Sequence, residues 1–215
     1  MAKKRKDTME FRFYEVPQGE AALILHGDSW VRVYGHEDFH LHFHNLMEIG
    51  ICRYGSGDMY FDMEINRYQT EDFTIIPANF PHITVSDGEE ANFWEYIFFD
   101  LRKIVEELFP HNQVYQTELG KNIAKSPFFS SRAKTPGMYA LIDEIIAEMR
   151  NQKPFYQKLI KIRLEALVME MVRGIGVEES SNSVKGTNME QIAAALDYIN
   201  KNYSRTITAS ELARL

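Results

Sequence analysis

The sequence predicts an α+β protein: an N-terminal antiparallel β-barrel, then an α-helical hairpin, then the first helices of a second helical domain. Three observations predict it. Short segments rich in aromatic and β-branched residues alternate with turn signals through residues 11–100, a pattern typical of an antiparallel barrel or sandwich. Apolar residues then recur at three- and four-residue spacing through residues 136–174. Finally, residues 176–187 have the Gly, Ser and Asn content of a linker.

The chain is therefore expected to have five parts. These are a basic tail at 1–10, a β-barrel at 11–100, a helical region with a hairpin at 101–175, a linker at 176–187, and a helical segment at 188–215. Six strands are expected in the barrel, at residues 11–15, 30–34, 47–54, 59–63, 73–76 and 93–99. Turn signals separate them at residues 26–29, 55–58, 65–67 and 86–89.

After the barrel, the pattern predicts helices. A short helix is expected over residues 101–109, and a short helix with a loop over 116–134. The hairpin follows. Its first helix is predicted at 136–151, with Thr135 as the N-cap and proline at the first helical position. Pro154 ends this helix and opens the second, which runs to about residue 174.

The second helix of the hairpin carries two apolar stripes. One comprises Ile160, Leu164, Leu167 and Met171, and the other Leu159, Ile162, Ala166 and Met169. A helix that docks on one surface needs a single stripe. The second stripe predicts a further partner, and we expect a homodimer through helices 136–174. Burial of this helix deep between the barrel and the hairpin is the alternative.

Beyond the linker, the sequence indicates an amphipathic helix that begins at Asn188, and then a second helix. Thr208 is its expected N-cap, and Glu211 occupies the capping-box position three residues later. The chain stops at Leu215, about two turns into that helix. We therefore expect the natural protein to continue past Leu215.

Composition argues against several classes of protein, among them disulfide-rich and membrane-spanning ones. The 215-residue chain is 45% apolar, enough for a substantial core, and its net charge of −7 gives no electrostatic footprint for nucleic acid. Its one cysteine, Cys52, excludes an internal disulfide and fits a reducing cytoplasm. Cys52 is expected to be a small buried thiol rather than a nucleophile. No apolar run approaches the roughly 18 residues of a membrane span.

A cluster of histidines is the strongest candidate for a functional site. His42, His44 and Glu48 lie near the entry of one predicted strand and share even parity, so a regular strand would point them to one face. An antiparallel neighbour is expected to bring His82 beside them. Three imidazoles and a carboxylate suit one divalent transition metal, namely zinc, nickel, iron or manganese. The alternative is that these side chains are the polar lining of an organic-ligand pocket.

The parity of Glu48 also predicts where a pocket lies. Gly50 and Cys52 would face into the barrel, whereas Met47, Ile49 and Ile51 would pack outward. Small inward residues leave room for a ligand. The candidate pocket residues are Trp30, Arg32, Tyr34, Cys52, Tyr60, Trp94 and Tyr96. For the aromatic residues, a place in the core is the alternative.

The spacing His42-x-His44-x3-Glu48-x6-Gly55 resembles the first motif of the cupins, and Glu71 to His82 resembles the second. The resemblance implies a jelly-roll barrel. Glu71 and Asn79 depart from it, because cupins usually have glycine there, and Ser86 stands where asparagine is common.

The stretch from Met189 to Ala213 resembles the opening of an AraC-type helix-turn-helix domain. Together with the order of the parts, it implies a bacterial AraC-family transcriptional regulator. The resemblance implies that this chain is the part that senses a small-molecule effector, such as a sugar or related metabolite, and dimerises. DNA would be bound through the part beyond Leu215, and the chain itself is not expected to be an enzyme.

Two other functions remain open. The same three histidines and glutamate would also suit a metal-dependent cupin enzyme, either an isomerase or a dioxygenase. The linker and the AraC-like segment favour the regulator, because a free-standing enzyme has no use for them. The third function is an oligomerisation module whose barrel is vestigial.

Overall fold

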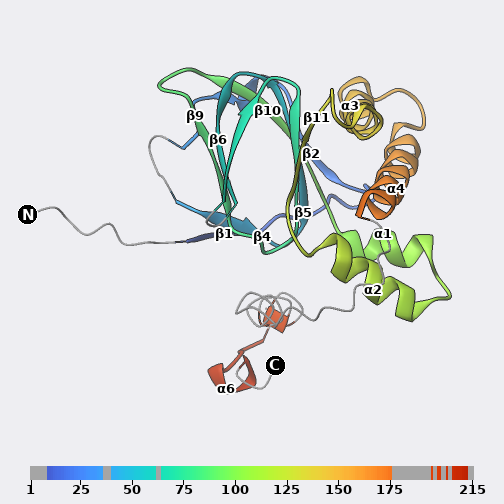
Figure 1. The fold of residues 1–215 in the computed structure, drawn as a ribbon. Coiled ribbons are helices and arrows are strands. Elements are labelled where there is room, and N and C mark those ends of the chain that lie inside the picture. Colours follow the sequence, from blue (N-terminus) through green and yellow to red (C-terminus); the bar gives the residue numbers. More distant parts are fainter. Residues whose placement is uncertain are drawn as a thin grey trace, which may run out of the picture. The chain divides into compact units, whose positions relative to one another are not determined.

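The computed structural model describes residues 9–35, 40–61, 64–175, 195, 198–199, 202 and 205–212. The chain divides into two compact units, residues 1–177 and 178–215. That division falls inside the predicted linker, 176–187, which lies outside the described residues, as does most of the predicted tail. The first unit is an α+β structure, in which ten of the described strands precede two helices, and an eleventh lies between these and two further helices (Figure 1).

One sheet has five strands. Its order is β1 (Glu10–Arg12), β4 (His42–His44), β9 (His82–Ser86), β6 (Ser56–Phe61) and β7 (Glu64–Gln69). All neighbours are antiparallel except β1 and β4, which run parallel. The wholly antiparallel pairing that the sequence predicts is therefore wrong at β1. Between β1 and β4 the chain passes through β2 and β3 of the other sheet, so β4 returns in the direction of β1.

The other sheet has six strands. Its order is β11 (Phe128–Ser131), β8 (Asp72–Ile76), β5 (Met47–Tyr54), β10 (Asn92–Phe99) and β2 (Leu23–Leu25), and β3 (Val31–Arg32) also pairs with β10. A short 3₁₀ turn, η1 (Asp28–Trp30), precedes β3. Because the described strands form two sheets, the single closed barrel of the sequence prediction is not confirmed.

Four helices share one apolar cluster with the outer face of the six-stranded sheet (Figure 1). They are α1 (Leu101–Leu108), α2 (Gln113–Ile123), α3 (Pro136–Asn151) and α4 (Tyr156–Ile175), and α1 and α2 lie beside α4. The predicted bounds of α3 are confirmed, with proline at its first position. Thr135 precedes it but makes no side-chain cap, since its hydroxyl is 2.8 Å from the hydroxyl of Ser130.

Two apolar clusters follow from the alternation of side chains along the central strands. Met47, Ile49 and Ile51 of β5 pack outward among the apolar side chains of the helices. Cys52 faces the other way, into a second cluster that includes Trp94 and residues of the five-stranded sheet. The predicted parity of β5 is therefore confirmed, and the core lies on both faces of the six-stranded sheet.

Three local predictions are wrong. In the turn predicted at 55–58, only Gly55 lies between strands, because β5 ends at Tyr54 and β6 begins at Ser56. Residues 65–67, expected to be a turn, lie inside β7, which pairs with β6 along its whole length. Residues 128–131, expected to be loop, form β11 on the edge of the six-stranded sheet. In each case pairing with a neighbouring strand overrides a weak local preference.

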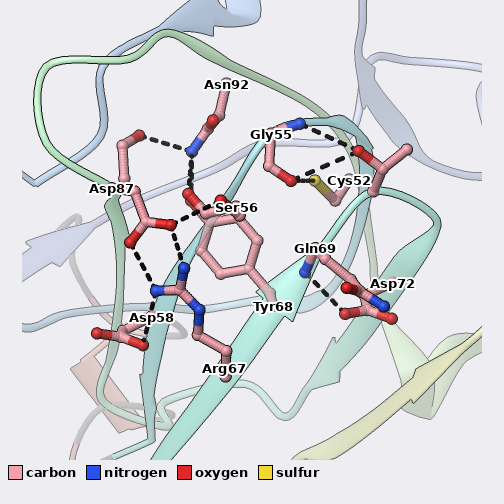
Figure 2. Close-up of polar contacts among 12 residues, drawn as sticks. Cys52, Gly55, Ser56, Asp58, Arg67, Tyr68, Gln69, Asp72, Asp87 and Asn92 are labelled. Atoms are coloured by element: carbon pink, nitrogen blue, oxygen red, sulfur yellow. Dashed lines mark hydrogen bonds and ion pairs between the residues drawn. The ribbon is translucent and has the colours of Figure 1, made fainter.

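Figure 2 shows polar contacts around the turn between β5 and β6. The Asn92 amide donates to the Ser56 carbonyl and to the hydroxyls of Tyr68 and Ser86, at 2.9, 2.6 and 2.9 Å. On the surface beside it, Arg67 pairs with Asp58 and Asp87. The buried amide thus binds three segments together, and this part of the space between the sheets is filled.

Glu95 is the buried centre of a charge network between the six-stranded sheet and α3. Its carboxylate is fully buried and accepts hydrogen bonds from Arg53 at 2.5 Å and Arg150 at 2.7 Å. Arg53 also pairs with Asp143 of α3, at 2.6 Å. Burial raises the pKa of Glu95, but the two arginines outweigh it and hold the pKa below 4.5.

We expect Glu95→Gln to lower the free energy of unfolding by about 2 kcal/mol at pH 7, because it removes a buried charge that two arginines need. The pKa of Glu95 is depressed in the folded state, so its contribution is present above the unfolded pKa and is lost as pH falls through the folded value. Urea unfolding at several pH values would show the difference from wild type shrinking below about pH 4.5. A deficit that stays constant down to pH 3 would contradict this, and the exposed Glu90→Gln is the control.

In the second unit the structure describes part of the predicted helical segment. α6 (Ala209–Leu212) follows Thr208. The Thr208 amide donates to the Glu211 carboxylate at 2.8 Å, and the Glu211 amide donates to the Thr208 hydroxyl at 3.3 Å. The predicted capping box is therefore confirmed. The start predicted at Asn188 lies outside the described residues. In the described part of the chain, no helix combines the length and apolarity needed to cross a membrane.

Candidate functional site

A cavity of about 950 Å³ opens in the first unit, and residues of both sheets line it. Four of the predicted pocket residues are in its walls: Trp30, Arg32, Tyr34 and Tyr96. Three of the four predicted metal ligands are in the same walls: His42, Glu48 and His82. The aromatic residues and the histidine cluster therefore share one chamber.

Three predicted pocket residues do not line this cavity. Cys52 and Trp94 are fully buried in the cluster between the sheets. Gly50 allows this packing, since a Cβ there would lie 3.3 Å from the Trp94 ring, so the ring fills the space left by the small residue. Burial raises the pKa of the Cys52 thiol to about 12, which fits the inert buried thiol of the prediction. Tyr60 alternates with the buried Met59 and thus faces away from the space between the sheets.

The cavity also has wall residues that the sequence prediction missed. Arg12 and Tyr14 come from β1 and the segment after it, and Phe98 comes from β10. Phe98 pairs in register with Glu48. It also shares the parity of Tyr96 along the predicted strand, and that parity could have been used to predict its place in the wall. Arg12 reaches the site through the parallel pairing of β1 with β4, which no local pattern indicates.

Strand register assembles the histidine cluster. His42 of β4 pairs directly with His82 of β9, and their ring centroids are 4.3 Å apart. Glu48 enters from β5, in the other sheet, so the prediction that one strand carries His42, His44 and Glu48 is wrong. Ligand atoms of His42, Glu48 and His82 all lie within 4.8 Å of one another. His44 is outside this group of three, but its Nε2 is 3.1 Å from Glu48 Oε2.

Backbone carbonyls fix the orientation of two imidazoles. Nδ1 of His44 is 2.7 Å from the Leu46 carbonyl, and Nδ1 of His82 is 2.9 Å from the Phe80 carbonyl. A carbonyl only accepts, so each Nδ1 carries the proton. In the neutral tautomer each Nε2 is then a bare lone pair. Those lone pairs face the Glu48 carboxylate, at 3.1 Å for His44 and 3.6 Å for His82.

In this tautomer, no proton lies between the Glu48 carboxylate and the ring nitrogens that face it. Neither Nε2 has a hydrogen-bond partner of good geometry, and the same holds for Nδ1 of His42. Lone pairs that converge on a buried carboxylate repel it unless a cation lies between them, which is either a proton on an imidazole or a metal ion. The donor set, nitrogen atoms with one carboxylate, fits a divalent transition metal.

The electrostatics of the cluster show what a cation there does. Burial raises the pKa of Glu48, but the positive charge of a protonated His82, with hydrogen bonds from His82 and His44, outweighs burial and holds the pKa well below its usual range. Burial, with the nearby His82 and Arg12, lowers the pKa of His42 to about 2. His42 is thus a neutral imidazole that faces an ionised carboxylate. A bound metal would take the place of the proton between Glu48 and the other two imidazoles.

The loop that carries His82 contains one of the residues at which the cupin resemblance breaks. Asn79 stands where glycine is usual and has a φ of 62°, in the left-handed region. The backbone N–H of Asn79 donates to the His44 carbonyl at 2.7 Å, and this hydrogen bond holds the loop against β4. Glu71, the other such residue, also has a positive φ, of 70°, and pairs with Arg132 at 2.6 Å. Both departures therefore keep the backbone shape of a glycine.

Comparison with solved structures supports the fold. An apo ToxT variant from Vibrio cholerae superposes with a TM-score of 0.54 at 12% identity, covering 89% of this chain and 68% of that chain. ToxT of the same organism with bound unsaturated fatty acid gives 0.50 at 11% identity, covering 90% and 64%. CuxR, an AraC-like transcriptional activator, gives only 0.43 at 13% identity, covering 79% and 56%. No protein-family model and no curated protein matches the sequence.

Proposed function

We propose that the chain is the effector-sensing and dimerising part of a cytoplasmic, ligand-responsive transcriptional regulator of the AraC type. The observation that carries the proposal is the cavity of about 950 Å³ in a unit that precedes an AraC-like segment. The likeness to ToxT, one structure of which holds a fatty acid, supports it. The effector binds in this cavity, and DNA is bound by a part of the protein beyond Leu215.

The proposed mechanism is a shift between two arrangements of a dimer. A ligand can move such an equilibrium only by its difference in affinity for the two states. Tyr96 of the cavity and Glu95 of the buried network are consecutive residues of β10, and Glu95 binds Arg150 of α3. An effector that moves Tyr96 would therefore also move Glu95, the neighbouring residue in β10, and through its ion pair with Arg150 would shift α3.

The proposed dimer forms through helices 136–174. On α4, the stripe from Ile160 to Met171 is buried, whereas Leu159 and Ile162 of the other stripe are exposed, Ile162 by 58%. Phe155, just before α4, is 75% exposed. The exposed apolar surface is thus at the N-terminal half of α4, since Ala166 and Met169 are half-buried.

We expect Ile162→Glu to convert the dimer to a monomer, because the substitution buries an unpaired charge in the interface. Sedimentation velocity of the two proteins at equal concentration would show the change. Ile65→Glu, on the exposed β7, is the matched control and should remain dimeric. A wild-type monomer at high concentration would contradict the proposed dimer.

We also propose that the cavity binds one divalent transition metal through His42, Glu48 and His82, with His44 as a fourth ligand or a hydrogen-bond partner of Glu48. When bound, the metal would supply a Lewis acid to which an effector oxygen coordinates. The backbone carbonyls of Leu46 and Phe80 would orient the imidazoles, as outer partners of metal ligands commonly do.

The same donor set favours one alternative function, a metal-dependent cupin isomerase or dioxygenase. A thermal-shift screen of sugars and related metabolites, with and without metal, tests the two together. Stabilisation by a compound that is recovered unchanged supports the regulator. Conversion of the compound supports the enzyme. A protein that no compound stabilises contradicts both and leaves an oligomerisation module.

A further inference from the structure

Arg32 differs from the other charged residues of the cavity. Its guanidinium lies 4.7 Å from the ring centroid of Trp30 and 4.9 Å from that of Tyr34. These rings are themselves fixed, because the Tyr34 hydroxyl donates to the Trp30 carbonyl at 2.7 Å. Trp30 also packs edge-on against Tyr96, with centroids 5.3 Å apart. Arg32 is therefore held by stacking, which leaves its N–H groups available to bind a planar anion.

Arg12 and Glu48, two of the other charged residues of the cavity wall, each have a charged or ring-nitrogen partner. Arg12 binds Glu10 through two nitrogens, at 2.7 and 3.0 Å. Glu48 faces His44 and His82. Within the described part of the chain, no carboxylate lies within ion-pair distance of Arg32. The cavity thus contains a guanidinium whose charge no described protein group neutralises.

From this we infer that the effector is a small organic carboxylate, with its carboxylate bound by Arg32 and its body against the aromatic rings of Trp30, Tyr34 and Tyr96. The inference rests on the proposed function and narrows it. Arginine matches a carboxylate with two parallel N–H···O bonds. The remaining apolar wall, which includes Phe98 and Ile83, suits the body of a ring or a short chain.

A singly charged group fits better than a phosphate. Glu48 and Glu89 also line the cavity, and a dianion would be repelled by both. Among the described arginines of the cavity wall, Arg32 is the one without a carboxylate partner, and its single positive charge would have to oppose that repulsion. A carboxylate carries one charge, which this single guanidinium can neutralise.

The test uses the full chain and pairs of compounds that differ in charge. D-galacturonate is compared with D-galactose, and benzoate with benzamide, while D-glucose 6-phosphate represents phosphates. Thermal shift identifies binders, and calorimetry gives their Kd. We expect a carboxylate to bind at least ten times more tightly than its neutral partner. Arg32→Gln should raise its Kd about 10- to 100-fold, since one charge-assisted pair is lost.

Two further variants separate the effect of the guanidinium fork from that of charge alone. Arg32→Lys retains the charge but not the planar fork, so an intermediate Kd is expected. Arg67→Gln removes a surface charge that is not in the cavity wall and should leave the Kd unchanged. Far-ultraviolet circular dichroism verifies that each variant is folded.

Each remaining outcome overturns the inference. Neutral compounds that bind as tightly as the acids, or an acid whose Kd is unchanged in Arg32→Gln, would show that the effector is not anchored by charge, while the proposed sensor would stand. Tighter binding of D-glucose 6-phosphate than of either acid would replace carboxylate by phosphate. Failure of every compound, neutral or charged, to bind would count against both the inference and the proposed function.

Discussion

His82→Ala is expected to raise the Kd for Zn²⁺ or Ni²⁺ at least 100-fold. His82 contributes one of three ligand atoms that lie within 4.8 Å of one another, and its Nε2 lone pair is aimed at Glu48 by the contact of Nδ1 with the Phe80 carbonyl. Loss of even an outer partner of a metal ligand typically costs 10- to 100-fold in affinity, so loss of a ligand costs more. Equilibrium dialysis with elemental analysis of the purified chain measures it.

His111→Ala is the matched control, because His111 is exposed in the loop between α1 and α2. His44→Gln separates two views of the site: a loss as large as that of His82→Ala makes His44 a fourth ligand, and a smaller loss makes it a partner of Glu48. Metal at 100 times its Kd should also stabilise wild type by about 2.7 kcal/mol, an increase that a chelator removes. Wild-type protein that takes up no metal would contradict the proposed site.

Gly57→Ala is expected to lower the free energy of unfolding by about 4 kcal/mol. A Cβ at Gly57 would lie 2.0 Å from the backbone carbonyl oxygen of Val85 and 2.6 Å from the Tyr68 hydroxyl. Because Val85 belongs to β9, which pairs with β6, the strands must separate to admit a methyl group. That separation would also disturb the hydrogen bonds of Asn92 to Ser56 and Tyr68 (Figure 2). Overpacking of this kind is among the few causes of large mutational losses.

Urea unfolding of the two proteins tests this, with Gly120→Ala in α2 as the control. A Cβ at Gly120 has no neighbour within 4 Å, and alanine is favoured over glycine in a helix. The control should therefore gain up to about 1 kcal/mol. A loss below about 1 kcal/mol for Gly57→Ala would contradict the close approach of the two strands.

Elements with a strong local signal could be predicted from the sequence. Pro136 and the three- and four-residue spacing of Ile142, Ile145 and Ile146 define α3, and their burial against the sheet follows from that spacing. Alternation along β5 separates Ile49 and Ile51 from Cys52. These signals are local, so no knowledge of the partner strand is needed.

Features set by distant partners could not be predicted. The parallel pairing of β1 with β4, which brings Arg12 to the cavity, depends on the path of the chain through two intervening strands. The ring of Trp94 fills the space beside Gly50, although small residues in the sequence suggested an open lumen there. Sequence spacing placed His42 and His82 in one cluster, but the lone-pair arrangement around Glu48 depends on carbonyls that only the folded loop positions.

The cavity as an effector site is the claim on which the account depends, and a crystal structure of the chain grown with a stabilising compound from the screen tests it most directly. The account predicts difference density for the compound between the ring of Trp30 and the His42–His82 pair, in contact with Tyr96. Density for the compound outside this cavity, with the cavity itself free of it, would contradict the account.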